Sequence, residues 1–358
     1  MDRKKFIKRA LILSGLLFAG NLMFRKKKLQ TIESYTSNPA LNTVMQDWPG
    51  TPLDKDNRFV NLEHPWLPDY GQIAKFLTQA NPQRDVKKND TWRIPVIKDD
   101  AWLEDPADKI VWLGHASFFI QLSGTRILID PVYGTLPVGK RFSDLPVAAG
   151  KLLNIHYILV SHSHYDHCDK DSLKLLASNN PQAKILTGLK LDNVISDWIE
   201  NPVHTAGWYQ QYQLDDGMEI TFLPSRHWSN RSIFDVNSTL WGSFMIQKAG
   251  KCIYYGGDSG FDSHFSSIGR LFPGIDVALI GAGAYAPTWF MGPNHQDPYD
   301  AVRAFHATGA RMFIPFHYGT FDSADEPMGE PEQILNKLEA EGKVNKLKIL
   351  KLGEVLAV

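Results

Sequence analysis

Residues 161–167 (SHSHYDH) place three histidines and one aspartate within six positions, directly after an apolar stretch. Imidazole nitrogens and carboxylate oxygens are the ligands that Zn²⁺ takes in proteins when no thiolate is used. His162 and His164 are two positions apart, so an extended chain projects both to one side. Asp166 and His167 follow where the chain turns, toward a second position. The segment therefore predicts ligands for two adjacent metal ions. The alternative is a polar loop with chance histidines, whose ionisable groups would be costly to hold together without metal.

Four further candidate ligands each follow a predicted strand. They are Asp130 after 126–129, His227 after 219–223, Asp258 after 252–255 and His317 after 312–314. Polar residues on loops at strand ends, held by a rigid sheet, are the usual arrangement of functional sites. Two glycines precede Asp258 and let the backbone turn tightly, so this carboxylate could bridge two ions.

Strands and helices alternate from Ile110 onward, which predicts a layered αβ domain with packed sheets. The predicted strands are 110–113, 118–122, 126–129, 157–160, 184–186, 219–223, 241–247, 252–255, 277–280 and 312–314. The predicted helices are 70–79, 171–177, 298–307 and 331–341. Ser123-Gly124 signals a two-residue hairpin. The chain then divides into a basic and apolar tip (1–28), a linker and extension packing on the core (29–107) and the ligand-bearing domain (108–358).

Composition excludes several classes of protein. With 43% hydrophobic residues, a chain of 358 residues can bury a large core and is not disordered. Residues 1–28 hold nine basic residues and one acid, which leaves 29 basic and 38 acidic residues in the remainder. An acidic body argues against nucleic acid as a partner. Cys168 and Cys252 cannot form a disulfide framework, and we expect two reduced, packed thiols.

The apolar run 10–24 lies between two basic clusters and predicts an uncleaved membrane-anchor helix. Alternatives are a signal peptide, including one of twin-arginine type, or a helix packed on the protein itself. We expect attachment to a membrane, the inner membrane of a bacterium. The facing side stays undefined because both flanks are basic.

In its ligand pattern the sequence resembles the metallo-β-lactamase superfamily. The five motifs of that fold occur in order: Asp130; His162, His164, Asp166 and His167; His227; Asp258; His317. Within the superfamily, the chain looks most like N-acyl phosphatidylethanolamine-hydrolysing phospholipase D. The supporting segments are 112–116 (WLGHA), 240–243 (LWGS), 281–285 (GAGAY), 289–291 (WFM), 295–298 (HQDP) and 317–321 (HYGTF). The resemblance implies an α+β, four-layer αβ/βα sandwich that binds two Zn²⁺ per chain.

The resemblance also implies a role for each matching residue. His162, His164 and His227 would hold one zinc ion; Asp166, His167 and His317 would hold the other; Asp258 would bridge the two. Tyr165 and His295 match positions that contact the substrate phosphate region, although Asn294 stands where the lipase has glutamine. Asp130 and His115 would support the ligands, with His115 near Asp130; a satisfied core histidine is the alternative for His115. His164 stands where the di-iron branch has glutamate, which favours zinc.

The implied function is a zinc-dependent phosphodiesterase that splits a membrane phospholipid into phosphatidic acid and an N-acylethanolamine. Asp166 and Asp258 would orient the nucleophile, and His295 would hydrogen-bond the phosphate or protonate the leaving alcohol. Expected partners are the phospholipid and the membrane surface, with a homodimer possible. Two alternatives stay open: another hydrolase of the fold, such as a sugar-phosphate lactonase, and an inactive membrane-tethered binding protein.

Three further features near these motifs allow two interpretations each. Arg226 and Arg231 flank His227 and would either meet a phosphate or form solvated salt bridges. Residues 289–291 (WFM) would either fill the core or form an apolar lip for an acyl chain.

Overall fold

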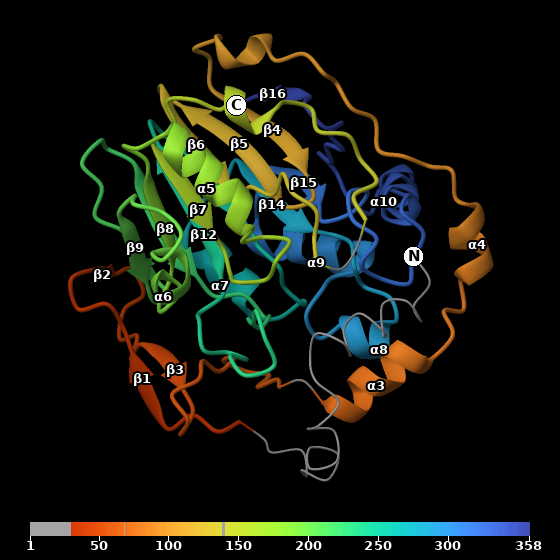
Figure 1. Cartoon of the computed structure of the whole chain (residues 1–358), viewed down its shortest axis with the longest axis horizontal. Coiled ribbons are helices and arrows are strands. Elements are labelled where there is room, and N and C mark those ends of the chain that lie inside the picture. The colour runs from red at the N-terminus through yellow and green to blue at the C-terminus, as the bar shows by residue number, and fades with distance from the viewer. Residues whose placement is uncertain (1–29, 68, 138–139) are drawn as a thin grey trace.

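Two mixed β-sheets pack face to face at the centre of the molecule (Figure 1). The computed structural model describes residues 30–358 except 68 and 138–139. The first sheet has the order β16 (Val355–Ala357), β4 (Lys109–Gly114), β5 (Ser117–Leu122), β6 (Thr125–Ile129), β7 (Tyr157–Val160), β8 (Lys184–Gly188) and β9 (Val203–Ala206). The second has the order β15 (Met312–Phe316), β14 (Val277–Gly281), β13 (Lys251–Tyr255), β12 (Ser243–Lys248), β11 (Glu219–Leu223), β10 (Gln210–Gln211) and β2 (Asn42–Thr43).

Helices cover the outer face of each sheet and complete four layers (Figure 1). On the first sheet these are α5 (Lys170–Asn179) and α6 (Asp192–Ile195). On the second they are α7 (His264–Leu271), α9 (Pro298–Thr308) and α10 (Glu330–Ala340). The predicted αβ/βα sandwich is thus confirmed.

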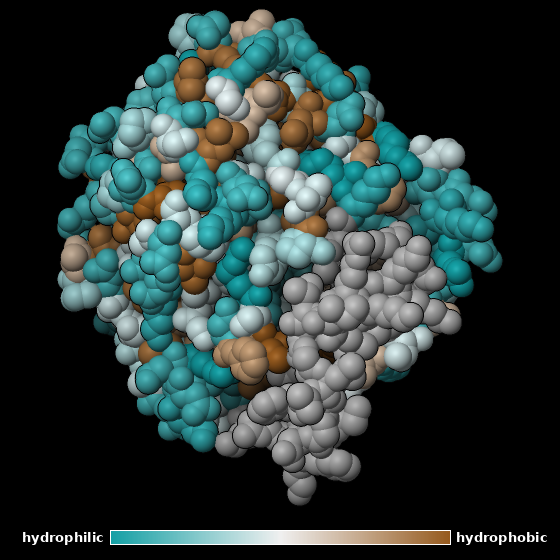
Figure 2. All heavy atoms as spheres, viewed as in Figure 1, coloured by the Kyte–Doolittle hydropathy of each residue, from teal (hydrophilic) through white to brown (hydrophobic). Residues whose placement is uncertain are grey.

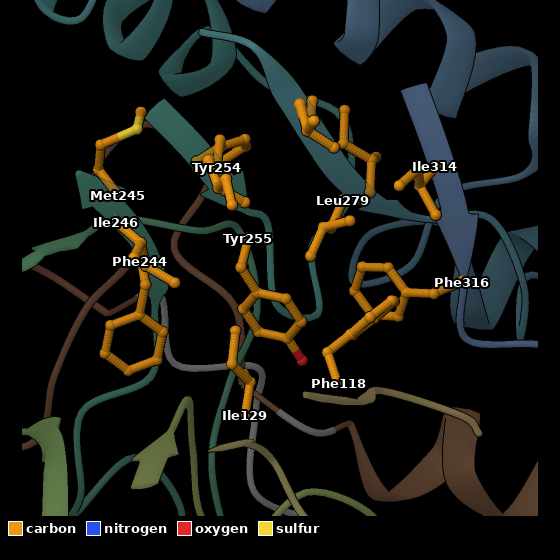
Figure 3. Close-up of a cluster of buried hydrophobic side chains, with 14 of the residues drawn as sticks. Phe118, Ile129, Phe244, Met245, Ile246, Tyr254, Tyr255, Leu279, Ile314 and Phe316 are labelled. Carbon is orange, nitrogen blue, oxygen red and sulfur yellow. The ribbon is translucent and has the colours of Figure 1, made fainter. Parts of the chain in front are cut away.

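Alternation along the strands explains why the first sheet is buried on both faces. In β7, Tyr157 and Leu159 face the second sheet, whereas Ile158 and Val160 pack with α5. Between the sheets, Phe118 and Ile129 of the first meet Phe244, Tyr255, Leu279 and Phe316 of the second (Figure 3). The surface in Figure 2 is largely hydrophilic by contrast, with smaller hydrophobic areas.

Residues 30–107 wrap around the sandwich. β1 (Ser34–Thr36) pairs with β3 (Thr51–Leu53), and β2 extends the edge of the second sheet by pairing with β10. α3 (Tyr70–Thr78) lies against the short α8 (Thr288–Met291), where the rings of Phe76 and Phe290 stack 4.6 Å apart. α4 (Arg84–Asn89) follows along the same side (Figure 1). The segment expected as a linker and an extension packing on the core also contributes a strand to the second sheet.

The predicted membrane anchor at residues 10–24 lies outside the described part of the chain. Among residues 30–358, apart from the three left out, no helix combines the length and apolarity needed to cross a bilayer. Cys168 and Cys252 are free and buried, as predicted.

Candidate metal centre

The candidate ligands meet where strands of both sheets end. His162, His164, Asp166 and His167 follow β7, and His227, Asp258 and His317 follow β11, β13 and β15. Because these strands bring their carboxyl ends to one edge of the sandwich, residues far apart in sequence become neighbours. All seven predicted ligands lie in this one cluster.

Three histidines form the first group. His162 Nε2 lies 2.8 Å from His164 Nδ1, and His227 Nε2 lies 3.1 Å from the same His164 atom. The three rings, supplied by two segments of the sequence, therefore each direct one nitrogen to a common point.

A second group adjoins the first through Asp258. His167 Nε2 lies 3.1 Å from Asp258 Oδ2, and His317 Nε2 lies 3.0 Å from Asp258 Oδ1. Asp166 Oδ2 is 3.7 Å from both histidine nitrogens. Asp258 Oδ2 is also 3.7 Å from His227 Nε2 of the first group, so this carboxylate lies between the two groups.

Hydrogen bonds fix which ring nitrogen faces the centre. His227 Nδ1 faces the carbonyl of Asn294 at 3.0 Å, and His167 Nδ1 faces Asp130 Oδ2 at 2.7 Å. A carbonyl oxygen and a carboxylate only accept, so both Nδ1 atoms carry the proton. Each Nε2 lone pair in the neutral ring is then directed at other ligand atoms. Converging lone pairs and carboxylates fit divalent cations, and the donor set of imidazole and carboxylate suits zinc.

Burial and the mutual attraction of histidines and carboxylates together set the protonation of this centre. Burial lowers the pKa of His162 and His227 well below the ordinary value, which keeps both rings neutral. Burial also opposes the charge on His167, but Asp258 and Asp166 outweigh it and hold the pKa of His167 well above its ordinary value. Burial likewise opposes ionisation of Asp258, yet His167 and His317 hold its pKa well below the ordinary range. The two ionised carboxylates thus favour a positive charge in the centre, which is a proton on His167 in the metal-free protein and would be a bound cation otherwise.

Asp130 connects the centre to the core. Besides His167, its carboxylate accepts hydrogen bonds from Ser161 Oγ at 2.6 Å and from Tyr255 OH at 2.6 Å. The Tyr255 ring belongs to the packing between the sheets (Figure 3). Asp130 therefore supports a ligand rather than facing the other ligands itself.

Three residues at this edge of the sandwich have a left-handed backbone. Asp130, His115 and His317 have φ values of 40°, 51° and 70°, in the left-handed region that most residues avoid. Gly257, beside Asp258, has φ 58°, and a Cβ there would approach the carbonyl oxygen of Gly242 to 2.5 Å. Only glycine allows this close approach.

One predicted placement needs correction, and one open alternative is decided. His115 was expected near Asp130, but its Nε2 lies 2.9 Å from Asp166 Oδ2, so it orients a different carboxylate. For Arg226, the structure shows the second of the two alternatives: its Nε lies 3.8 Å from Asp262 Oδ2, and its Nη1 donates to the carbonyl of Phe261, 3.0 Å away.

The two predicted substrate contacts lie at the rim of the cluster. His295 Nδ1 is 3.8 Å from Asp258 Oδ2, and its side chain is 14% exposed. Tyr165 is 39% exposed, and its hydroxyl donates to the Arg231 carbonyl. Trp289 and Phe290 are half-buried against α3, so they belong to neither the deep core nor a free lip.

Sequence reasoning missed several supporting residues. Asn61, from the wrapping segment, donates to the His227 carbonyl at 2.7 Å and accepts from the His227 backbone N–H at 3.2 Å. Tyr255 and Ser161 hold Asp130. Ser161 precedes the ligand segment directly and could have been considered, whereas nothing in the sequence links Asn61 to His227.

Comparisons with known proteins agree with this geometry. Residues 125–318 match the family described as "Beta-lactamase superfamily domain". The N-acyl-phosphatidylethanolamine-hydrolyzing phospholipase D 1 of Caenorhabditis elegans is 32% identical over 63% of this chain and 66% of its own length, slightly under two thirds. The mitochondrial enzyme of that activity from Saccharomyces cerevisiae is 27% identical over 88% and 70%.

A solved structure shows the same fold. Igni18, described as a metallo hydrolase of the archaeon Ignicoccus hospitalis, superposes with a TM-score of 0.54 at 23% identity, over 70% of this chain and 98% of its own. With the family match over more than half of the chain, the chain belongs to the metallo-β-lactamase superfamily and is a metal-dependent hydrolase of it.

Proposed function

We propose that this protein is a dinuclear zinc phosphodiesterase that hydrolyses N-acyl phosphatidylethanolamine to phosphatidic acid and an N-acylethanolamine. The observation that carries the proposal is an intact set of seven ligands in a chain similar, over most of its length, to two phospholipases of that type. The intact set also disfavours an inactive binding protein, which would have no reason to keep every ligand.

His162, His164 and His227 would hold one ion, and Asp166, His167 and His317 the other, with Asp258 shared between them. Bound divalent ions supply Lewis acidity toward phosphoryl oxygens and lower the pKa of water to about 7. His115 holds Asp166 through a 2.9 Å contact, and Asp130 holds His167 through a 2.7 Å contact. These second contacts fix the ligand atoms before substrate arrives.

His295 is the residue best placed to act on substrate. It is partly exposed, and its ring lies 5.1 Å from that of His227 and 5.2 Å from that of His317. A phosphate bound over the two ligand groups would lie beside it. His295 would then donate a hydrogen bond to a phosphate oxygen or to the departing alcohol oxygen.

The test is incubation of the zinc-loaded protein with N-acyl phosphatidylethanolamine and analysis of the lipids by mass spectrometry. We expect phosphatidic acid and N-acylethanolamine in equal amounts. His295→Ala should lower kcat by about 10²–10⁴-fold. The control His306→Ala, in a surface histidine of α9, should not. Turnover of a lactone without phosphatidic acid would support the lactonase alternative instead.

A further inference from the structure

Arg231 lies four positions after His227, yet its side chain reaches the ligand segment 161–167. Its Nη1 donates to the carbonyl of Ser163 at 2.9 Å and to the carbonyl of Cys168 at 2.7 Å. These two carbonyls lie on either side of His164, Asp166 and His167. We propose that Arg231 is a positioning residue that fixes the ligand segment in its metal-binding conformation.

Aromatic rings hold the guanidinium of Arg231 in place. Its Cζ lies 4.0 Å from the ring centroid of Tyr165 and 4.9 Å from that of Trp198. The Tyr165 hydroxyl in turn donates to the Arg231 carbonyl at 3.2 Å. A planar guanidinium stacks on rings and donates in fixed directions, which a lysine ammonium cannot reproduce.

The backbone around Arg231 is itself anchored. The Arg231 N–H donates to Asp235 Oδ1 at 3.1 Å, and the Ser232 N–H donates to the same atom at 2.8 Å. The hydroxyls of Ser163 and Ser229 form a second link between the two segments, 2.6 Å apart. These hydrogen bonds fix the backbone from which the Arg231 side chain extends toward the ligand segment.

This arrangement has a consequence for the first ligand group. His162 and His164 come from one segment, whereas His227 comes from the segment that carries Arg231. Arg231 ties Ser163 and Cys168 to the loop after His227. It thereby keeps the ring nitrogens of His162 and His164 at a fixed distance from the ring nitrogen of His227. It carries positive charge and faces backbone carbonyls, so it acts through the ligands and does not coordinate metal itself.

The role rests on the metal dependence of the protein and not on its lipid substrate. The test therefore uses zinc itself: affinity and stoichiometry are measured in the full chain by competition with a chromophoric chelator. We expect Arg231→Met to weaken zinc binding by about 10- to 100-fold, as loss of residues that support ligands commonly does. Arg231→Lys keeps the positive charge but loses the planar guanidinium that donates to both carbonyls. We expect this variant to lose at least half as much zinc affinity as Arg231→Met, on a logarithmic scale.

A matched control separates positioning from general stability. Arg93 also stacks on a ring, that of Phe142 at 5.0 Å, and donates to the carbonyls of Asp90 and Trp92, but it touches no ligand segment. Arg93→Met should bind zinc as the wild type does. If Arg231→Met does not fold, Arg231→Lys carries the test.

Folded Arg231 variants that bind two zinc ions with unchanged affinity would overturn the positioning role. Weakened zinc binding in a protein that fails to cleave the lipid would leave this role standing and reject the proposed substrate. In an active protein, Arg231→Lys should lower kcat more than it changes KM, because the substituted group does not contact substrate.

Discussion

Asp130 shows how a single buried residue serves both the core and the metal centre. Its carboxylate accepts from His167, Ser161 and Tyr255, and the last of these belongs to the packing between the sheets. The orientation of a metal ligand is thus coupled to the packing of the sandwich.

Asp130→Asn should weaken zinc binding by about 10- to 100-fold, because an amide cannot accept all three hydrogen bonds. Metal titration against a chelator would measure the change. The control is Asp276→Asn, which removes a carboxylate that accepts from the Cys252 backbone N–H at the opposite end of the strands. Equal affinities for Asp130→Asn and wild type would refute the supporting role.

For single residues, the sequence predicted which seven candidate ligands lie together, because each is a histidine or aspartate shortly after an apolar strand. It placed His115 beside the wrong carboxylate. His115 lies in the turn between β4 and β5, and its partner Asp166 lies in the ligand segment after β7. Their contact depends on how these two segments pack in three dimensions. The partners of Arg231 are set in the same way by loop geometry.

Among the secondary-structure elements, α7 illustrates burial of a titratable group. His264 begins this helix, is buried, and lies 3.2 Å from Ser259 Oγ through its Nε2. Burial lowers the pKa of His264 to about 3, with Arg226 as a further cause. The folded protein therefore keeps this ring neutral at a pH where the unfolded chain protonates it.

This shift gives a signed pH dependence. Between about pH 6.5 and pH 3 the unfolded state binds the extra proton, so His264 lowers the stability of the fold by about 1.4 kcal/mol for each pH unit of acidification. His264→Gln removes this contribution. Urea unfolding of both proteins at pH 7.5 and pH 5 should show that the variant loses less stability than the wild type. A difference between the two proteins that does not change with pH would contradict the assignment.

Elements with strong patterns were predicted well, and short ones were not. β7 and β11 have the predicted bounds: β7 (YILV) is a continuous apolar run, and in β11 (EITFL) the apolar residues Ile220, Phe222 and Leu223 mark the strand. β2, β10 and β9 were missed: β2 and β10 have two residues each, and their pairing depends on tertiary contacts. α7 was missed because its sequence, HFSSIGRL, contains a glycine and two serines that weaken the helical signal.

At the scale of the whole molecule, the sequence combines a basic tip with an acidic body. Nine basic residues in 1–28 precede a metal-binding domain, and we propose that this tip holds the active site near an anionic membrane. Each basic residue close to such a surface contributes about 1 kcal/mol.

The full chain should therefore float with vesicles that contain phosphatidylglycerol. Replacing Lys26, Lys27 and Lys28 by glutamate should reduce flotation, and so should raised salt. The same change at Lys337, Lys343 and Lys346, which are exposed on the body, serves as the control and should leave flotation unchanged. Equal flotation of the two variants would argue against attachment through the tip.

The proposed reaction is hydrolysis of a phosphodiester by attack at phosphorus. It is tested most directly by running the zinc-loaded protein on N-acyl phosphatidylethanolamine in water enriched in ¹⁸O. Attack at phosphorus predicts one ¹⁸O atom in the phosphatidic acid and none in the N-acylethanolamine. Label in the N-acylethanolamine, or a failure of the protein with two bound zinc ions to form phosphatidic acid, would contradict the proposed reaction.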